Sequence, residues 1–211
     1  MPELTKLYDA VLNGDAKTAL AVTKEAIDAG VDPLELVTKH MVPAMDEVGR
    51  RFECEEYFVP ELLLAARAMK GALGLIRPLL AAQGAQPVGR VVIGTVKGDL
   101  HDIGKNLVAS MLEGAGFEVI DLGADVTPEK FVNAAKEKSA HIVALSALLT
   151  VTMPMMKNTI AALNEAGIRG QVKVMVGGAP VTEHWAKEIG ADGYSENAGS
   201  AVTLARSLMK S

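Results

Sequence analysis

The chain has 211 residues, of which 49% are hydrophobic and 22% are charged. This composition predicts one large or two small globular domains and excludes disorder over most of the length. The net charge of −5 argues against nucleic acid as the main partner, because phosphate binding requires a basic face. The single cysteine, Cys54, excludes a disulfide framework and any zinc site built from several cysteines. With neither a signal-peptide pattern nor a run that could span a bilayer, we expect a cytoplasmic protein without a membrane partner.

Apolar residues recur at helical spacing over the first eighty residues, with no convincing strand. The first helix should end at Asn13-Gly14, and Asp15 should cap a second that Gly30 closes. Asp32-Pro33 is typical of the start of a third helix, and a fourth is expected from Pro60. We therefore predict a four-helix bundle over residues 1–84, followed by a linker within residues 81–87 that has little to bury.

The second half alternates strands and helices. Strands are expected at 91–96, 118–122, 141–146, 172–178 and 193–195, with a helix after each. This order predicts an α/β domain over residues 88–211, with a doubly wound, flavodoxin-like or Rossmann-like sheet of five parallel strands. Ligands bind at the carboxyl ends of such strands, so the chemistry should lie in the loops after Val96, Ser146 and Gly177.

The loop after the first of these strands, residues 97–104, allows three interpretations. A phosphate loop is disfavoured, because five residues separate Gly98 from Gly104 and Asn106 stands where a Walker motif has Ser or Thr. A purely structural turn leaves unexplained why an Asp stands two residues before His101. In the third interpretation His101 binds a metal whose other ligands come from a macrocycle, because a lone imidazole cannot hold an ion by itself. Asp99 would then accept the other ring N–H and fix the tautomer.

Three motifs, each at the end of its own predicted strand, resemble the signature of cobalamin-binding domains. They are Asp99-x-His101-x-x-Gly104, Ser146-x-Leu148 and Gly177-Gly178. The resemblance implies a bound cobalamin or related corrinoid, with His101 as the metal ligand in place of the cofactor's own base. It also implies a channel for the nucleotide tail, in which a side chain at Gly178 would occupy the ligand's space. The residues implied to contact the cofactor, or to support His101 in a relay, are Asp99, His101, Asp102, Ile103, Gly104, Ser146, Leu148, Thr150, Thr152, Gly177, Gly178, Tyr194 and Ala198.

Residues 45–69 resemble the helical cap that precedes this domain in corrinoid methyltransferases. In that resemblance Phe58 is a lid over the cobalt-bound methyl group, although a plain core aromatic would show the same helical spacing. Because the chain ends without a barrel-sized domain, it resembles the separate corrinoid protein of a three-component methyltransferase system. Such systems serve methylamines, methanol, betaines or methoxylated aromatics.

The resemblance implies a carrier that is not catalytic by itself. It would cycle between Co(I) and methyl-Co(III) with His101 bound to the cobalt. Its implied partners are a substrate:corrinoid methyltransferase, an acceptor methyltransferase that uses tetrahydrofolate or a thiol cofactor, and a reductive-activation protein.

Two other functions remain open at this point. A cobalamin-sensing regulator would carry a DNA-binding module ahead of the bundle, whereas here the sequence starts directly in the first helix. The cobalamin-binding subunit of an adenosylcobalamin mutase shares the Asp99-x-His101 motif, but it would need a barrel partner where the cap is expected.

Overall fold

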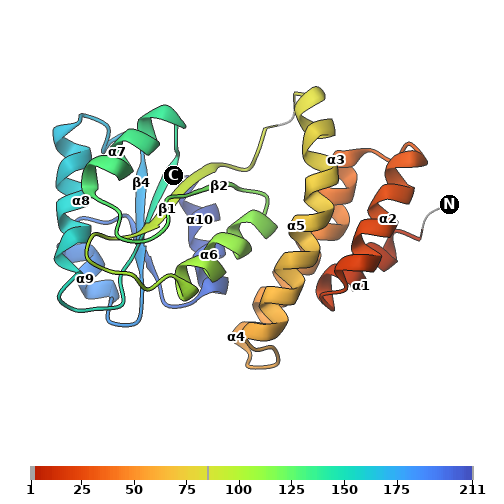
Figure 1. Cartoon of the computed structure of the whole chain (residues 1–211), viewed down its shortest axis with the longest axis horizontal. Coiled ribbons are helices and arrows are strands. Elements are labelled where there is room, and N and C mark those ends of the chain that lie inside the picture. The colour runs from red at the N-terminus through yellow and green to blue at the C-terminus, as the bar shows by residue number, and fades with distance from the viewer. Residues whose placement is uncertain (1–2, 85, 211) are drawn as a thin grey trace. The chain divides into compact units, whose positions relative to one another are not determined.

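The computed structural model describes residues 3–84 and 86–210, apart from the side chain of Ala81. The chain divides into two compact units, Met1–Pro87 with Glu113–Gly116 and Val88–Leu112 with Phe117–Ser211. In Figure 1 the colour runs from the red and yellow helices of the first unit to the green and blue elements of the second.

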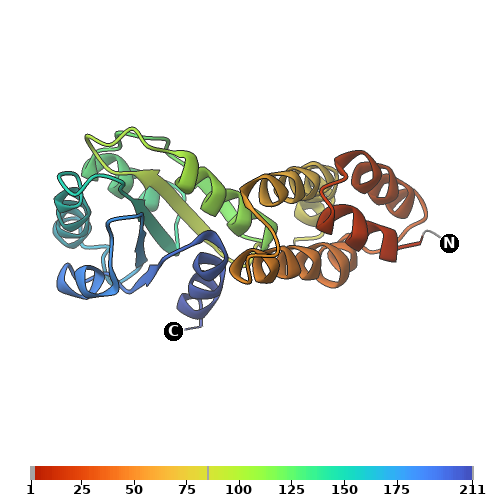
Figure 2. The ribbon, with the colours of Figure 1, turned by 90° about the horizontal axis from the view of Figure 1, so that it is seen from below.

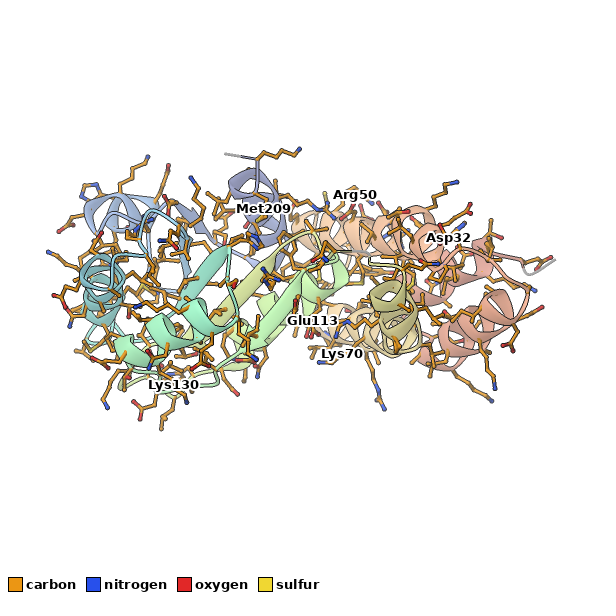
Figure 3. All side chains as sticks on the ribbon, turned by 90° about the horizontal axis from the view of Figure 1, so that it is seen from above. Asp32, Arg50, Lys70, Glu113, Lys130 and Met209 are labelled. Atoms are coloured by element: carbon orange, nitrogen blue, oxygen red, sulfur yellow. The ribbon has the colours of Figure 1, made fainter. Side chains whose placement is uncertain are left out.

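The first unit is helical, as predicted. Asp15 accepts a hydrogen bond from the Thr18 N–H at the start of α2, and Asp32, labelled in Figure 3, accepts one from the Leu34 N–H at the start of α3. The long α5 packs against α1, α2 and α4, which places the apolar faces of the helices inside. The elements are α1 (Thr5–Leu12), α2 (Ala16–Asp28), α3 (Pro33–Glu35), the π-helix η1 (Leu36–Met41), α4 (Val42–Glu53) and α5 (Val59–Ala82).

The predicted third helix is continuous, but it contains a wide turn that the sequence did not predict. Within η1 the Val42 N–H donates to the Val37 carbonyl, five residues back. Pro43 lacks an N–H and cannot donate to the carbonyl of Lys39, so regular α-helical bonding is interrupted at this point. The linker was predicted to begin at Ala81, but α5 continues through Ala82. Ala85, within that linker, lies outside the described residues.

The second unit holds a parallel sheet with strand order β2-β1-β3-β4-β5, which confirms the doubly wound prediction. Its strands are β1 (Arg90–Thr95), β2 (Glu118–Asp121), β3 (Ile142–Ser146), β4 (Lys173–Gly177) and β5 (Gly193–Ser195). Its helices are α6 (Ile103–Gly114), α7 (Pro128–Glu137), α8 (Pro154–Glu165), α9 (Glu183–Glu188) and α10 (Ala198–Leu208).

Helices cover both faces of this sheet. Figure 1 shows α7, α8 and α9 on one side of the strands and α6 and α10 on the other, and Figure 2 gives a second view. Phe131 of α7 and Met156 of α8 are fully buried against Val143 and Val174 of the sheet. Burial on both faces explains why β1, β3 and β4 are nearly continuous apolar runs. Among the residues described, no helix is both long and apolar enough to cross a membrane.

The strands end in register at the carboxyl edge of the sheet. Thr95 pairs with Ser146, Ser146 with Gly177, and Gly177 with Ser195. Each residue of this row is small, so the backbones of four neighbouring strands are little covered by their own side chains there.

Gly178 follows this row and has a positive φ of 128°. A Cβ atom built on it would lie 1.9 Å from the carbonyl oxygen of Ala147, far inside contact distance. From the resemblance alone, a side chain at Gly178 is expected to occupy the space of a ligand. The structure shows that the fold itself requires glycine here, with or without a ligand, because a side chain would collide with the protein's own backbone.

We therefore expect Gly178→Ala to destabilise the α/β unit by roughly 2 kcal/mol or more, through strain and overpacking. The single tryptophan, Trp185, lies on α9 of this unit, so its fluorescence during urea unfolding reports on the unit. Gly170→Ala is the matched control, because a Cβ atom at Gly170 meets nothing within 4 Å. Equal stability of the two variants would contradict this explanation.

Candidate functional site

The loop after β1 and the loop after β3 meet at the carboxylate of Asp99. This carboxylate is fully buried. Its Oδ1 atom accepts hydrogen bonds from the His101 Nδ1–H at 2.7 Å and the His101 backbone N–H at 3.1 Å. Its Oδ2 atom accepts from the backbone N–H groups of Leu148 at 2.8 Å and Leu149 at 3.1 Å. The Thr152 hydroxyl donates to the same Oδ2 at 2.7 Å, so hydrogen bonds join His101, Asp99 and Thr152.

These donors decide the charge of Asp99. Burial by itself would raise the pKa of Asp99, but hydrogen bonds from Thr152, from the His101 ring and from the Leu148 N–H hold the pKa well below its ordinary range. The group is therefore a carboxylate near neutral pH. A carboxylate only accepts hydrogen bonds, so Nδ1 of His101 must carry the proton that it shares with Asp99.

In a neutral His101 ring the other nitrogen, Nε2, then carries a lone pair, which is the form that binds a metal. The His101 side chain is 50% exposed, so it is open to a ligand from outside the fold. Within the described residues no three His, Cys, Asp or Glu side chains gather to hold an ion. A metal at His101 thus needs other ligands from elsewhere, which agrees with the macrocycle interpretation.

Apolar side chains are exposed around this imidazole. Leu100 is 75% exposed, Ile103 78% and Val151 80%. Leu148 and Leu149, whose N–H groups reach Asp99, also have exposed side chains. Exposed large apolar groups concentrated around one polar group are typical of a binding surface. The residues predicted from the sequence include Ile103 and Leu148 but not Leu100, Leu149 and Val151, because residues beside a motif show no recognisable sequence pattern.

The carboxyl-terminal side of the His101 loop is anchored by a buried lysine. Lys105 is 3% exposed, and its ammonium group donates to Asp121 at the end of β2 and to Oδ1 of Asn106, both at 2.6 Å. Asn106 in turn donates to Asp102. Because the ammonium group is buried and paired, it is not presented to a phosphate, which excludes the phosphate-loop interpretation.

The other predicted residues lie farther along the edge. Ser146 and Gly177 belong to the row at the strand ends, and Thr150 lies exposed within the loop after β3. Tyr194 lies on β5, three strands from β1, and the nearby Ala198, which begins α10, is buried. Phe58, in the helical unit, is 63% exposed, so its interpretation as a plain core aromatic is wrong.

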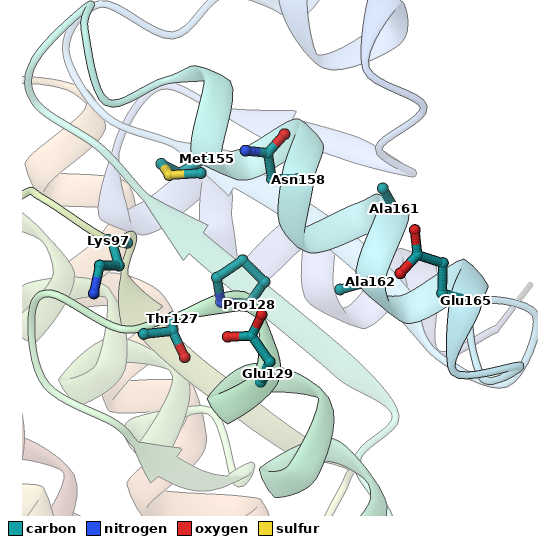
Figure 4. A pocket seen from close by; sticks show the side chains of 9 residues that line it. All are labelled: Lys97, Thr127, Pro128, Glu129, Met155, Asn158, Ala161, Ala162 and Glu165. Atoms are coloured by element: carbon teal, nitrogen blue, oxygen red, sulfur yellow. The ribbon is translucent and has the colours of Figure 1, made fainter.

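A surface pocket of about 510 Å³ lies elsewhere on the α/β unit, between α7 and α8 (Figure 4). Its lining includes Lys97, Thr127, Glu129, Met155 and Asn158. None of the predicted cofactor residues lines it, so it is separate from the His101 site.

Comparison with known proteins identifies the family. A B12 binding domain matches residues 89–203, and a second B12 binding domain matches residues 3–77. The chain belongs to the corrinoid-protein family, whose members carry methyl groups in methyltransferase systems. Its cofactor is therefore a corrinoid.

The similarity extends over nearly the whole sequence of these relatives. The chain is 47% identical to trimethylamine corrinoid protein 1 of Methanosarcina mazei, covering 98% of this chain and 96% of the relative. It is 44% identical to the dimethylamine corrinoid protein of Methanosarcina barkeri, covering 98% and 97%.

Solved structures of cobalamin-binding proteins are also similar to this chain. A cobalamin-binding protein from Desulfitobacterium hafniense matches with a TM-score of 0.80 at 34% identity, covering 99% of each chain. A chain of the methanol:cobalamin methyltransferase complex from Methanosarcina barkeri matches with a TM-score of 0.87 at 28% identity, covering 98% of this chain and 79% of that one.

The buried carboxylate of Asp99 should contribute measurably to the free energy of unfolding. Asp99→Asn should lower the free energy of unfolding of the α/β unit at pH 7 by about 2 kcal/mol, because the amide cannot accept from every donor that the carboxylate satisfies. A carboxyl whose pKa is lowered by folding stabilises the fold above its unfolded pKa, near the ordinary Asp value of 3.8, and this contribution is lost at lower pH. The difference between wild type and variant should therefore shrink as the pH falls below that value.

Urea unfolding followed by Trp185 fluorescence from pH 7 to pH 3 measures this difference. Asp102→Asn, which changes an exposed carboxylate of the same loop, is the matched control and should have little effect. A wild-type-to-variant difference for Asp99→Asn that stays constant over this range would contradict the assignment.

Proposed function

We propose that this chain carries a methyl group on the cobalt of its corrinoid, between a substrate-specific and an acceptor methyltransferase, with His101 as a ligand of the cobalt. The observation that supports this most is the hydrogen bond between Asp99 and Nδ1 of His101. It assigns the proton to Nδ1 and leaves Nε2 as the metal-binding atom of a half-exposed ring.

The residues around His101 fit a corrinoid. The cofactor, when bound, supplies the cobalt that takes up and releases the methyl group. Asp99 holds the proton at Nδ1 and thereby sets the basicity of Nε2, while Thr152 keeps the carboxylate in place. The exposed side chains of Leu100, Ile103 and Val151 would cover the face of a macrocycle and exclude water beneath it.

The row of small residues supports a path for the nucleotide tail. Ser146 and Gly177 lie in this row, and Gly178 follows it without a side chain. We assign tail contacts to these residues and to Thr150, and to Tyr194 and Ala198 at the β5 end. Phe58 is an exposed aromatic of the helical unit, and we propose that it shields the methyl group.

The relatives favour a methylated amine as the methyl source. Identity is 47% and 44% to proteins named for trimethylamine and dimethylamine, against 28% to a chain of the methanol complex. The remaining partners that we propose are an acceptor methyltransferase that uses tetrahydrofolate or a thiol cofactor, and a reductive-activation protein.

Reconstitution tests the proposed function. The chain, loaded anaerobically with cobalamin and reduced, should be methylated by trimethylamine or dimethylamine in the presence of the matching amine methyltransferase. Methanol, supplied with a methanol-specific methyltransferase, should methylate the chain poorly. Binding of cobalamin without methylation from any amine would contradict the proposal for the methyl source.

His101→Ala tests the ligand assignment in the same preparation. The histidines of the protein are labelled with nitrogen-15. In wild type, the EPR spectrum of the Co(II) form should show hyperfine coupling of the unpaired electron to nitrogen-15. The variant should lose this coupling while still binding cobalamin. His184→Ala, which changes an exposed histidine on α9, is the control and should retain the coupling. Nitrogen-15 coupling that persists in His101→Ala would show that another histidine is the ligand.

A further inference from the structure

Asp125 has a left-handed backbone conformation, which few residues other than glycine adopt. Its φ is +55°, in the left-handed region that glycine adopts freely, that Asn and Asp adopt occasionally, and that most other residues avoid. Glu55 and Ser139 are the other non-glycine residues with positive φ in the described part of the chain. Such a conformation persists when surrounding interactions hold it, and it is frequent at functional sites.

Two hydrogen bonds join Asp125 to the loop that carries the metal-binding histidine. Its Oδ1 atom accepts from the Gly98 N–H at 2.7 Å, and its own N–H donates to the Asp99 carbonyl at 3.0 Å. One residue thus holds the backbone on both sides of the peptide bond between Gly98 and Asp99. The left-handed conformation allows it to offer a backbone donor and a side-chain acceptor to the same dipeptide.

The segment around Asp125 is itself tied to the end of β1. The Val126 N–H donates to the Thr95 carbonyl, and the Thr95 N–H donates to the Gly123 carbonyl, each at 3.0 Å. The Thr95 hydroxyl donates to the His101 carbonyl at 2.9 Å. Segment 123–126 therefore extends the sheet beside the His101 loop, and its hydrogen bonds to β1 fix the position of the Asp125 backbone.

Asp99 is consequently held from two sides. Its carboxylate is bound by the loop after β3, through Leu148, Leu149 and Thr152. Its backbone is bound by Asp125, from the loop after β2. The side chain of Asp125 is exposed, so the left-handed conformation does not serve core packing. The two hydrogen bonds to Gly98 and Asp99 are what this conformation makes possible.

We propose that Asp125 is a positioning residue that holds Asp99, and through it the His101 ring, ready to ligate cobalt. This inference rests on the proposed role of His101. It assigns a function to a residue that lies outside the three sequence motifs and acts through the backbone of Asp99.

Three variants separate the acceptor from the backbone conformation. Asp125→Asn keeps an Oδ1 acceptor and tolerates positive φ. Asp125→Gly keeps the left-handed backbone and the N–H donor, so it should fold, but it removes the acceptor for Gly98. Ser139→Gly is the matched control, because it also relieves a positive φ in a turn before β3, at the opposite end of the strands from His101.

The first measurement uses the protein without cofactor. In Asp125→Gly, the amide hydrogens of His101 and Leu148, which donate to Asp99, should exchange with solvent at least about tenfold faster than in wild type, the factor for loss of one hydrogen bond to a charged group. Asp125→Asn and Ser139→Gly should exchange at the wild-type rate at these positions. Unchanged exchange in Asp125→Gly, or equally fast exchange in Asp125→Asn, would overturn the inference.

The second measurement uses cobalamin-loaded protein with nitrogen-15 histidine. Asp125→Gly should bind cobalamin but show a smaller fraction of Co(II) with nitrogen-15 coupling than wild type, whereas Asp125→Asn and Ser139→Gly should match wild type. Full coupling in Asp125→Gly would overturn the inference. Absence of coupling in wild type would instead contradict the proposed role of His101, so the two failures are distinguishable.

Discussion

The site depends on a charge kept inside the protein. A buried carboxylate is costly unless hydrogen bonds replace its hydration, and Asp99 receives them from both of the loops that meet there. These donors keep the group ionised, and an ionised Asp99 determines which nitrogen of His101 carries the proton. The chemistry that we assign to His101 therefore follows from how the fold satisfies one carboxylate.

That requirement explains why the motifs are divided along the chain. β1 and β3 are neighbours in the sheet although a strand and two helices separate them in sequence. The parallel arrangement brings their carboxyl ends to the same edge, so the Asp99 loop and the Leu148–Thr152 loop meet. On the other side, β2 and segment 123–126 hold the same loop through Lys105–Asp121 and Asp125. His101 is thus placed by backbone and buried polar groups, which leaves the exposed apolar side chains free to contact a cofactor.

Much of this arrangement was predictable from the sequence. Continuous apolar runs predicted the buried strands, and capping residues such as Asp15 and Asp32 predicted the helix starts. The resemblance to cobalamin-binding domains implied that Asp99, His101 and Thr152 act together. The positive φ of Asp125 was not predictable, because the hydrogen bonds that hold it join residues far apart in sequence. The reason for Gly178 was also missed, since its close neighbour, the carbonyl of Ala147, is brought there by the fold. Local pattern therefore predicted the elements, and the motifs and the resemblance predicted a role for His101, whereas the contacts that position His101 required the structure.

The protonation of the His101 ring tests the central claim most directly, and it requires no cofactor. Nitrogen-15 NMR of the neutral ring distinguishes the two tautomers by the shifts of Nδ1 and Nε2. If Asp99 sets the tautomer, the proton resides on Nδ1 in wild type, and Nε2 has the shift of an unprotonated nitrogen. A wild-type ring protonated at Nε2 would contradict the account, because the atom assigned to cobalt would then carry a hydrogen.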